Sequence, residues 1–173
     1  VKLFWFSQTI GTNRGLDNLL KALQLLTDQP FELHLLGNLS EEIKNLLLNY
    51  HVKNIQFHDP IPAEELPVGE AQVDIGLALE PAFSINNDLA LSNKIFTYLQ
   101  GGLAIVASDT RAQHHFIHQY PVIGKVFQKG DPQSLADVLM YYHQHRRSEG
   151  RCARAWSSSP RGGSANLKKW RRR

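Results

Sequence analysis

The sequence has little cysteine and no long apolar segment. Its 173 residues include one cysteine, Cys152, which excludes an internal disulfide framework and suits a reducing compartment. No run of about 18 apolar residues is present that could cross a bilayer. Residues 1–6 have neither the charged region nor the small-residue cleavage site of a secretory signal peptide. We therefore expect a cytoplasmic protein without a transmembrane segment, and its start on Val1 suggests a piece of a longer polypeptide.

Metal-binding motifs are also scarce. No Asp-x-Asp pair is present in the sequence, so a metal-assisted diphosphate site is not visible. His114, His115 and His118 lie close together, and the first and last could bind a metal on one face of a helix. Because no glutamate follows in a His-Glu-x-x-His pattern, a solvated or core histidine cluster is the favoured interpretation. We expect no metal site.

The charged residues divide the chain into an acidic body and a basic end. Residues 1–145 contain 9 lysines and arginines against 15 acidic residues, whereas residues 146–173 contain 10 against 1. The net charge of +3 therefore reflects the end of the chain and says little about partners of the body.

Residues 157–173 are rich in serine, glycine and arginine and have no apolar periodicity. Such a segment cannot bury a core, so we expect one folded domain over residues 1–156 and a disordered basic tail over residues 157–173. The arginines, with Trp156 and Trp170, could stack on and neutralise nucleic acid. Because no nucleic-acid-binding module is recognisable, a solvated end or an altered reading frame is the favoured interpretation, and no nucleic acid partner is expected.

Strand-like and helix-like segments alternate along the body of the chain. Continuous apolar runs predict buried strands at residues 3–7, 31–36, 54–58, 73–79, 103–107 and 122–127. Apolar spacing and capping residues predict helices from residue 16 to Pro30, after Ser40, around residues 63–65, and at residues 90–100, 111–119 and 131–145. Residues 80–87 are rich in helix-breaking residues and are expected to form a loop. The fold class is therefore α/β: a doubly wound, mainly parallel sheet with helices on both faces.

Ligands of such folds bind outside the carboxyl ends of the strands, so the loops after the strands are the first candidates for a site. The loop after the first strand reads Gly11-Thr12-Asn13-Arg14-Gly15 and leads into a helix. Free amides at a helix start bind phosphate, Arg14 can add a charge-assisted bond, and the glycines allow close approach. An ordinary strand-to-helix turn would have the same composition.

The second candidate is the start of the helix before the fifth strand. Its N-terminal end is polar, whereas Ile95, Phe96 and Leu99 can pack inward. A capped amphipathic helix would also explain this pattern. The polar residues expected at the carboxyl edge of the sheet, or one turn beyond it, are Ser92, Asn93, Lys94 and Thr97.

The order of the segments FSQTIGTNRGLDNLLKAL, ELHLLGN, IQFHDPIP, DIGLAL and LSNKIFTYLQGGLAIVASDT resembles the C-terminal domain of the group 1 glycosyltransferases, over residues 3–156. The resemblance implies the Rossmann-like, donor-binding half of a GT-B enzyme. It implies a nucleotide diphosphate sugar as donor substrate, no cofactor, and a saccharide or lipid-linked acceptor held by a missing N-terminal domain. A complete enzyme of this kind would be cytoplasmic or peripheral to the membrane.

The resemblance also implies roles for particular residues. Arg14, before Gly15, corresponds to the family's basic residue that contacts the donor diphosphate. The segment that contains Asp59 would lie near the nucleotide base, and Asn93, Lys94 and Thr97 would lie in the donor cleft, near the ribose and sugar. No catalytic residue is assigned.

Three features of the sequence, at four positions, depart from the family pattern. Gln8 stands where the family often has arginine, and Leu89 and Thr97 stand where it has a pair of glutamates. Ala104 replaces the proline of the family's Gly-Leu-Pro. The alternatives left open are a nucleotide-sugar epimerase-like domain and a non-catalytic nucleotide-binding or nucleic-acid-binding module.

Overall fold

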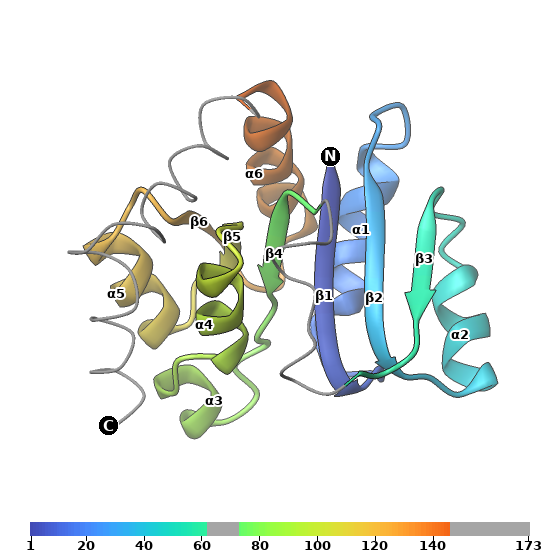
Figure 1. Ribbon diagram of the computed structural model, residues 1–173, viewed down its shortest axis with the longest axis horizontal. Helices are drawn as coiled ribbons and strands as arrows, with labels where there is room; N and C mark the ends of the chain where they lie inside the picture. The colour runs from blue at the N-terminus through green and yellow to red at the C-terminus, as the bar shows by residue number, and fades with distance from the viewer. Residues whose placement is uncertain (62–72, 146–173) are drawn as a thin grey trace.

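Six parallel strands form one sheet in the order β3-β2-β1-β4-β5-β6 in the computed structural model (Figure 1). The structure describes residues 1–61 and 73–145. Every pairing between neighbouring strands is parallel, which confirms the fold class expected from the sequence. The strands are β1 (Lys2–Thr9), β2 (Glu32–Asn38), β3 (Ile55–His58), β4 (Ile75–Ala78), β5 (Ala104–Ser108) and β6 (Gly124–Phe127).

Helices cover both faces of this sheet. One face packs against α1, α2 and α6 and the other against α4 and α5, each over its own cluster of buried apolar residues. The helices of the described residues are α1 (Leu16–Leu25), α2 (Glu41–Leu48), α3 (Ile85–Leu89), α4 (Asn93–Gln100), α5 (Arg111–Gln119) and α6 (Pro132–Gln144). None of them is both long and apolar enough to span a membrane.

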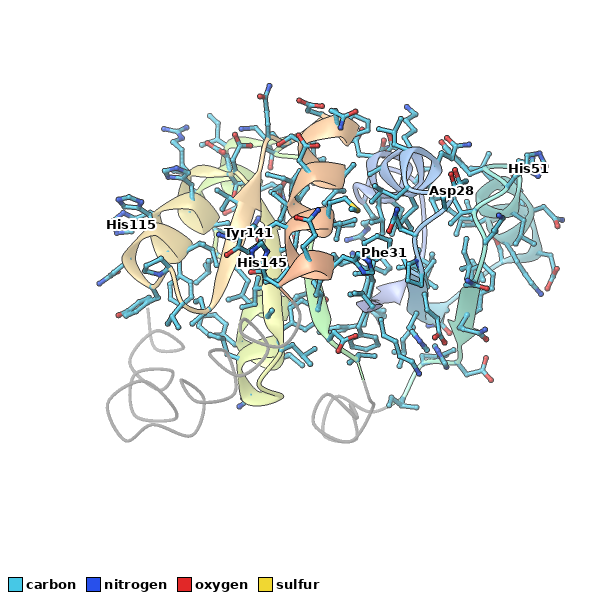
Figure 2. The ribbon with its side chains drawn as sticks, turned by 90° about the horizontal axis from the view of Figure 1, so that it is seen from above. Asp28, Phe31, His51, His115, Tyr141 and His145 are labelled. Atoms are coloured by element: carbon cyan, nitrogen blue, oxygen red, sulfur yellow. The ribbon has the colours of Figure 1, made fainter. Side chains whose placement is uncertain are left out.

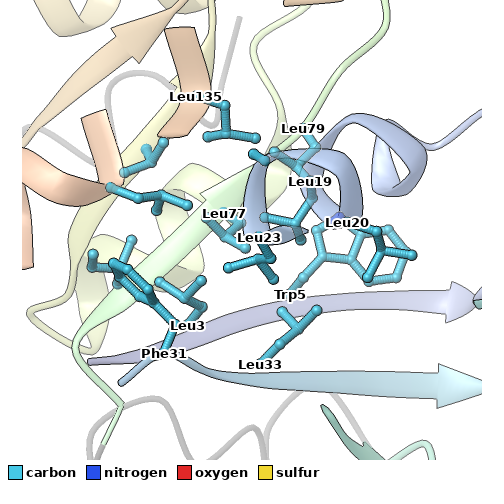
Figure 3. Packing of buried hydrophobic residues seen from close by; sticks show 14 of the residues in the cluster. Leu3, Trp5, Leu19, Leu20, Leu23, Phe31, Leu33, Leu77, Leu79 and Leu135 are labelled. Carbon is cyan, nitrogen blue, oxygen red and sulfur yellow. The ribbon is translucent and has the colours of Figure 1, made fainter. Parts of the chain in front are cut away.

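The larger core lies between β1, β2 and β4 on one side and α1 and α6 on the other (Figure 3). Trp5 of β1, Leu19 of α1 and Leu77 of β4 are each 0% exposed at its centre. Burying a large apolar side chain contributes roughly 1.5–3 kcal/mol, so these contacts hold α1 firmly on the sheet. The loop that leads into α1 is thereby kept at the carboxyl edge.

Contacts of aromatic rings connect α6 to β6 and to the residue before β2, near the amino edge of the sheet. The ammonium of Lys125, on β6, lies 4.0 Å from the ring of Tyr141, and that ring stacks on His145 at 4.3 Å. The ring of Phe31, just before β2, lies 5.7 Å from His143. Figure 2 looks onto this edge and labels Tyr141, His145 and Phe31.

Several expected boundaries are confirmed and others are wrong. Ser40 caps α2, accepting the amide of Ile43 at 3.3 Å, and Gly102, with φ of 66°, follows the end of α4. The first helix ends at Leu25, well before Pro30.

Two expectations for residues 80–100 are partly wrong, because this segment contains two helices, α3 and α4. A loop was expected at residues 80–87 and a single helix from Ala90. Ser84 accepts the amide of Asn87 and starts α3 inside the expected loop. Ala90 has extended backbone, so α4 begins afresh at Asn93. The expected helix around residues 63–65, Cys152, the domain boundary at 156 and the basic tail lie outside the described residues.

Candidate functional site

The chain turns in opposite directions from two neighbouring central strands, β1 and β4. From β1 it continues to β2 and β3 on one side, and from β4 to β5 and β6 on the other. The loop after β1 leads to α1 on one face of the sheet and the loop after β4 leads to α4 on the other, both from the carboxyl edge, the lower edge in Figure 1. Open parallel sheets bind ligands in the crevice at such a point. Gly15 has φ of 76°, and a Cβ there would lie 3.0 Å from the Cβ of Leu79, so the two loops approach closely.

On the α4 side of this crevice lies a hollow of about 660 Å³. Gln8 of β1 lines it together with Glu80, which follows β4. Four of the residues expected at the site line it as well: Ser92, Asn93, Lys94 and Thr97. The sheet therefore brings the polar start of α4 beside the ends of β1 and β4.

Glu80 is the centre of a polar cluster in this hollow. Its Oε1 accepts a hydrogen bond from the Ser92 hydroxyl at 2.8 Å and lies 3.3 Å from Lys94 Nζ. Its Oε2 accepts from Asn87 Nδ2 at 2.9 Å. The side chains of Glu80 and Lys94 are 17% and 16% exposed, so water screens this ion pair less than it would at the surface.

The electrostatics of the cluster favour the ionised carboxylate. Burial by itself raises the pKa of Glu80, but the Lys94 ammonium and the hydrogen bonds from Asn87 and Ser92 outweigh it and lower the pKa below its ordinary value. Lys94 also lies over the ring of Trp5, with Nζ 5.7 Å from the centroid. The hollow thus contains a preformed ion pair.

A buried polar network holds the backbone behind Glu80. The Glu80 amide donates to Ser108 Oγ at 2.8 Å. Gln113 Nε2 lies 3.0 Å from that hydroxyl and 3.2 Å from the carbonyl of Ala78. Ser108 and Gln113 are 1% and 0% exposed. This network joins the ends of β4 and β5 to α5 and sets where Glu80 leaves the sheet.

Arg14 lies in a second, neighbouring hollow of about 940 Å³. Gly15 and Lys129 also line it, and Lys129 Nζ is 3.6 Å from Asp109 Oδ1. Phe83 lines both hollows, with 76% of its surface exposed, and so lies on the boundary between them. The structure therefore brings Arg14 and Lys94 to one edge of the sheet, on either side of Phe83.

Two of the expected residues lie apart from these groups. Gly11 lines a smaller hollow of about 240 Å³ with Ile43 and Tyr50. Asp59 follows the end of β3, is exposed, and lines none of the three hollows. The residue before it, His58, has Nε2 2.9 Å from Nδ1 of His34.

The sequence model of the glycosyl transferases group 1 matches residues 2–145. The chain belongs to this glycosyltransferase family. No curated protein matches the chain significantly in sequence.

Solved structures share the fold at low sequence identity. A glycosyltransferase from Rickettsia africae superposes with a TM-score of 0.72 at 17% identity, covering 99% of this chain and 46% of the other. Anabaena HepE in complex with UDP and glucose gives 0.70 at 15%, covering 99% and 47%. The catalytic domain of the Helicobacter pylori cholesterol-alpha-glucosyltransferase gives 0.70 at 13%, covering 98% of both chains. The chain thus spans about half the length of the first two relatives.

The histidine cluster of this glycosyltransferase domain lies on α5. The rings of His114 and His118 stack with centroids 6.0 Å apart, and Figure 2 labels His115 on the same helix. Within residues 1–61 and 73–145, no group of three or more histidine, cysteine, aspartate or glutamate side chains could hold a metal ion.

Glu80 was not among the site residues expected from the sequence. It comes two residues after the end of a buried strand, at the carboxyl edge of the sheet, but it fell within a segment interpreted as a breaker-rich loop. Its partners Asn87, Ser92 and Lys94 come from α3 and the start of α4, and their convergence depends on the turn between those helices. Ser92 was expected among the substrate-binding residues at the carboxyl edge. Its hydroxyl donates to Glu80 and makes no capping bond to α4.

Proposed function

We propose that this domain binds a nucleotide diphosphate sugar and supplies the glycosyl group for transfer to an acceptor held by a separate N-terminal domain. One observation carries the proposal: the Lys94 ion pair, with Asn93 and Thr97, lines a polar hollow at the crevice between β1 and β4. This is where open parallel sheets bind nucleotides.

Cationic side chains on both sides of the crevice would attract the negatively charged diphosphate of the donor. Arg14 and the amides of the loop from Gly11 to Gly15, at the start of α1, would bind phosphate oxygens from one side. Lys94 would bind them from the other side. Transfer breaks the bond between the anomeric carbon and a diphosphate oxygen, so negative charge grows on the leaving nucleoside diphosphate, and fixed cations there lower the barrier.

Neutral polar side chains in the same hollow are able to hydrogen-bond the hydroxyl groups of the donor. Asn93 and Thr97 would hydrogen-bond ribose or sugar hydroxyls, while Ser92 would act by holding Glu80. Asp59, beyond β3, would lie near the base. The donor is a substrate, so no cofactor enters the proposal, and the acceptor would be a saccharide or a lipid-linked sugar.

The relatives support this proposal in two ways. HepE has been solved with UDP and with UDP-glucose, which are ligands of the class proposed here. The chain covers 45–47% of several relatives, including WaaG and HepE, so a second domain would have room to supply the acceptor. We therefore expect this polypeptide to bind nucleotide weakly and to transfer sugar slowly or not at all by itself.

Calorimetric titration with UDP, GDP and ADP tests the proposal. We expect saturable binding of one of them, weakened by Arg14→Ala about 10-fold or more, since a charge-assisted hydrogen bond contributes about 1.5–3 kcal/mol. Lys44→Ala is the matched control, because Lys44 is a cation on α2 paired with Glu41 at 3.6 Å. Failure of all three nucleotides to bind would refute the proposed function.

A further inference from the structure

We propose that Glu80 is a positioning residue of the donor site, which holds the Lys94 ammonium where the donor diphosphate would bind. The inference rests on the proposed function and adds a residue that the sequence pattern did not assign. Among the described residues that line this hollow, Glu80 is the one carboxylate and Lys94 the one cation.

The carboxylate of Glu80 is itself fixed in place. Asn87 from α3 and Ser92 from the start of α4 donate to different carboxylate oxygens, at 2.9 and 2.8 Å. The Glu80 amide is held by Ser108. The side chain therefore has a defined orientation, which a residue needs if it is to orient another.

Lys94 needs such a partner. Its side chain is long and flexible, and an ammonium has three N–H donors. One donor directed to Glu80, at 3.3 Å, leaves two for phosphate oxygens. With the Trp5 ring nearby at 5.7 Å, Lys94 loses rotamer freedom before a ligand arrives.

The negative charge of Glu80 also acts directly on an anionic ligand, by repelling it. Positioning of Lys94 strengthens the binding of the anion, whereas repulsion by Glu80 weakens it. Whether the affinity falls or rises when Glu80 is neutralised therefore shows which effect is larger. Glu80→Gln cannot reproduce the native contacts, because in one orientation its amide nitrogen would face the Asn87 Nδ2 donor and in the other it would face the Lys94 ammonium. Asn87 cannot turn its Oδ1 toward that nitrogen, since this oxygen accepts the Ala82 amide at 2.6 Å. We expect the variant to release Lys94 and to weaken binding.

The test is a double-mutant cycle, read by calorimetric titration of the 173-residue chain with UDP. We expect Glu80→Gln and Lys94→Met each to weaken UDP binding about 10-fold, and the double variant to be no weaker than Lys94→Met. Glu32→Gln is the matched control, because Glu32 lies 3.8 Å from Lys2 at the other end of the sheet. It should leave the affinity for UDP unchanged within about 2-fold.

Tighter or unchanged UDP binding by Glu80→Gln would overturn the proposal, and so would an additive cycle, with about 100-fold weakening in the double variant. Glu80→Asp keeps the charge, so it should recover part of the lost affinity, which a merely structural role would not require. If Glu80→Gln does not fold, the cycle with Glu80→Asp decides by the same criterion. If the unaltered chain binds none of UDP, GDP and ADP, both the proposed function and the role of Glu80 are refuted. If it binds UDP but the cycle is additive, only the role of Glu80 is refuted.

Discussion

Gly76, on β4, leaves room for the ring that fastens α4 to the sheet. A Cβ at this position would lie 2.2 Å from Cγ of Tyr98, which is 0% exposed. The Tyr98 hydroxyl donates to the carbonyl of Leu77 at 2.9 Å, and burial raises the pKa of this phenol, so the donor proton stays in place. Because Tyr98 lies one turn after Lys94, displacement of the ring would move the donor site.

Gly76→Ala should therefore cost both packing and a hydrogen bond. Forcing one methyl group into a well-packed core costs about 1–3 kcal/mol, and leaving a buried hydroxyl without its partner costs about 1–3 kcal/mol more. We expect a loss of about 2–6 kcal/mol in the free energy of unfolding, which lowers Tm by roughly 10 °C in a domain of this size.

Urea and thermal unfolding followed by circular dichroism measure this change. Gly11→Ala is the matched control, since a Cβ there would meet nothing within 4 Å, and its Tm should stay within about 2 °C of the unaltered protein. If Gly76→Ala unfolds at the same urea concentration as the control, the close packing of Tyr98 against β4 is wrong.

Two further changes are expected to alter stability. Gln113→Ala should lower the free energy of unfolding by about 2–4 kcal/mol, because it removes the buried donor shared by Ser108 and Ala78; an unchanged urea midpoint would contradict this. The pKa of Glu80 is lowered from 4.5 in the fold, so its stabilising contribution is complete above that value and is lost as pH falls through the folded pKa. The loss of stability in Glu80→Gln, measured by urea unfolding, should therefore be larger at pH 7 than at pH 3, and an equal loss at both would refute the assignment.

Local patterns in the sequence were enough to predict the sheet and most of its helices. The strands are continuous apolar runs because parallel strands are buried on both faces, as the full burial of β4 and β5 illustrates. The cap at Ser40 depends on residues three apart, so it too could be predicted from neighbouring positions. The helix break at Ala90 could not be predicted in this way. The segment around α3 is held by hydrogen bonds from Asn87 and Ser92 to Glu80, which lies 7 and 12 residues earlier in the chain.

The sequence by itself determined that this chain is a doubly wound α/β domain, with polar residues at Arg14 and at the start of α4 directed to the carboxyl edge of a parallel sheet. The tertiary structure alone decided how those residues are grouped. Phe83 lies between the hollows of Arg14 and Lys94, and Glu80 meets a lysine 14 positions later in the chain. Such contacts depend on where separate loops leave neighbouring strands, which local periodicity does not encode.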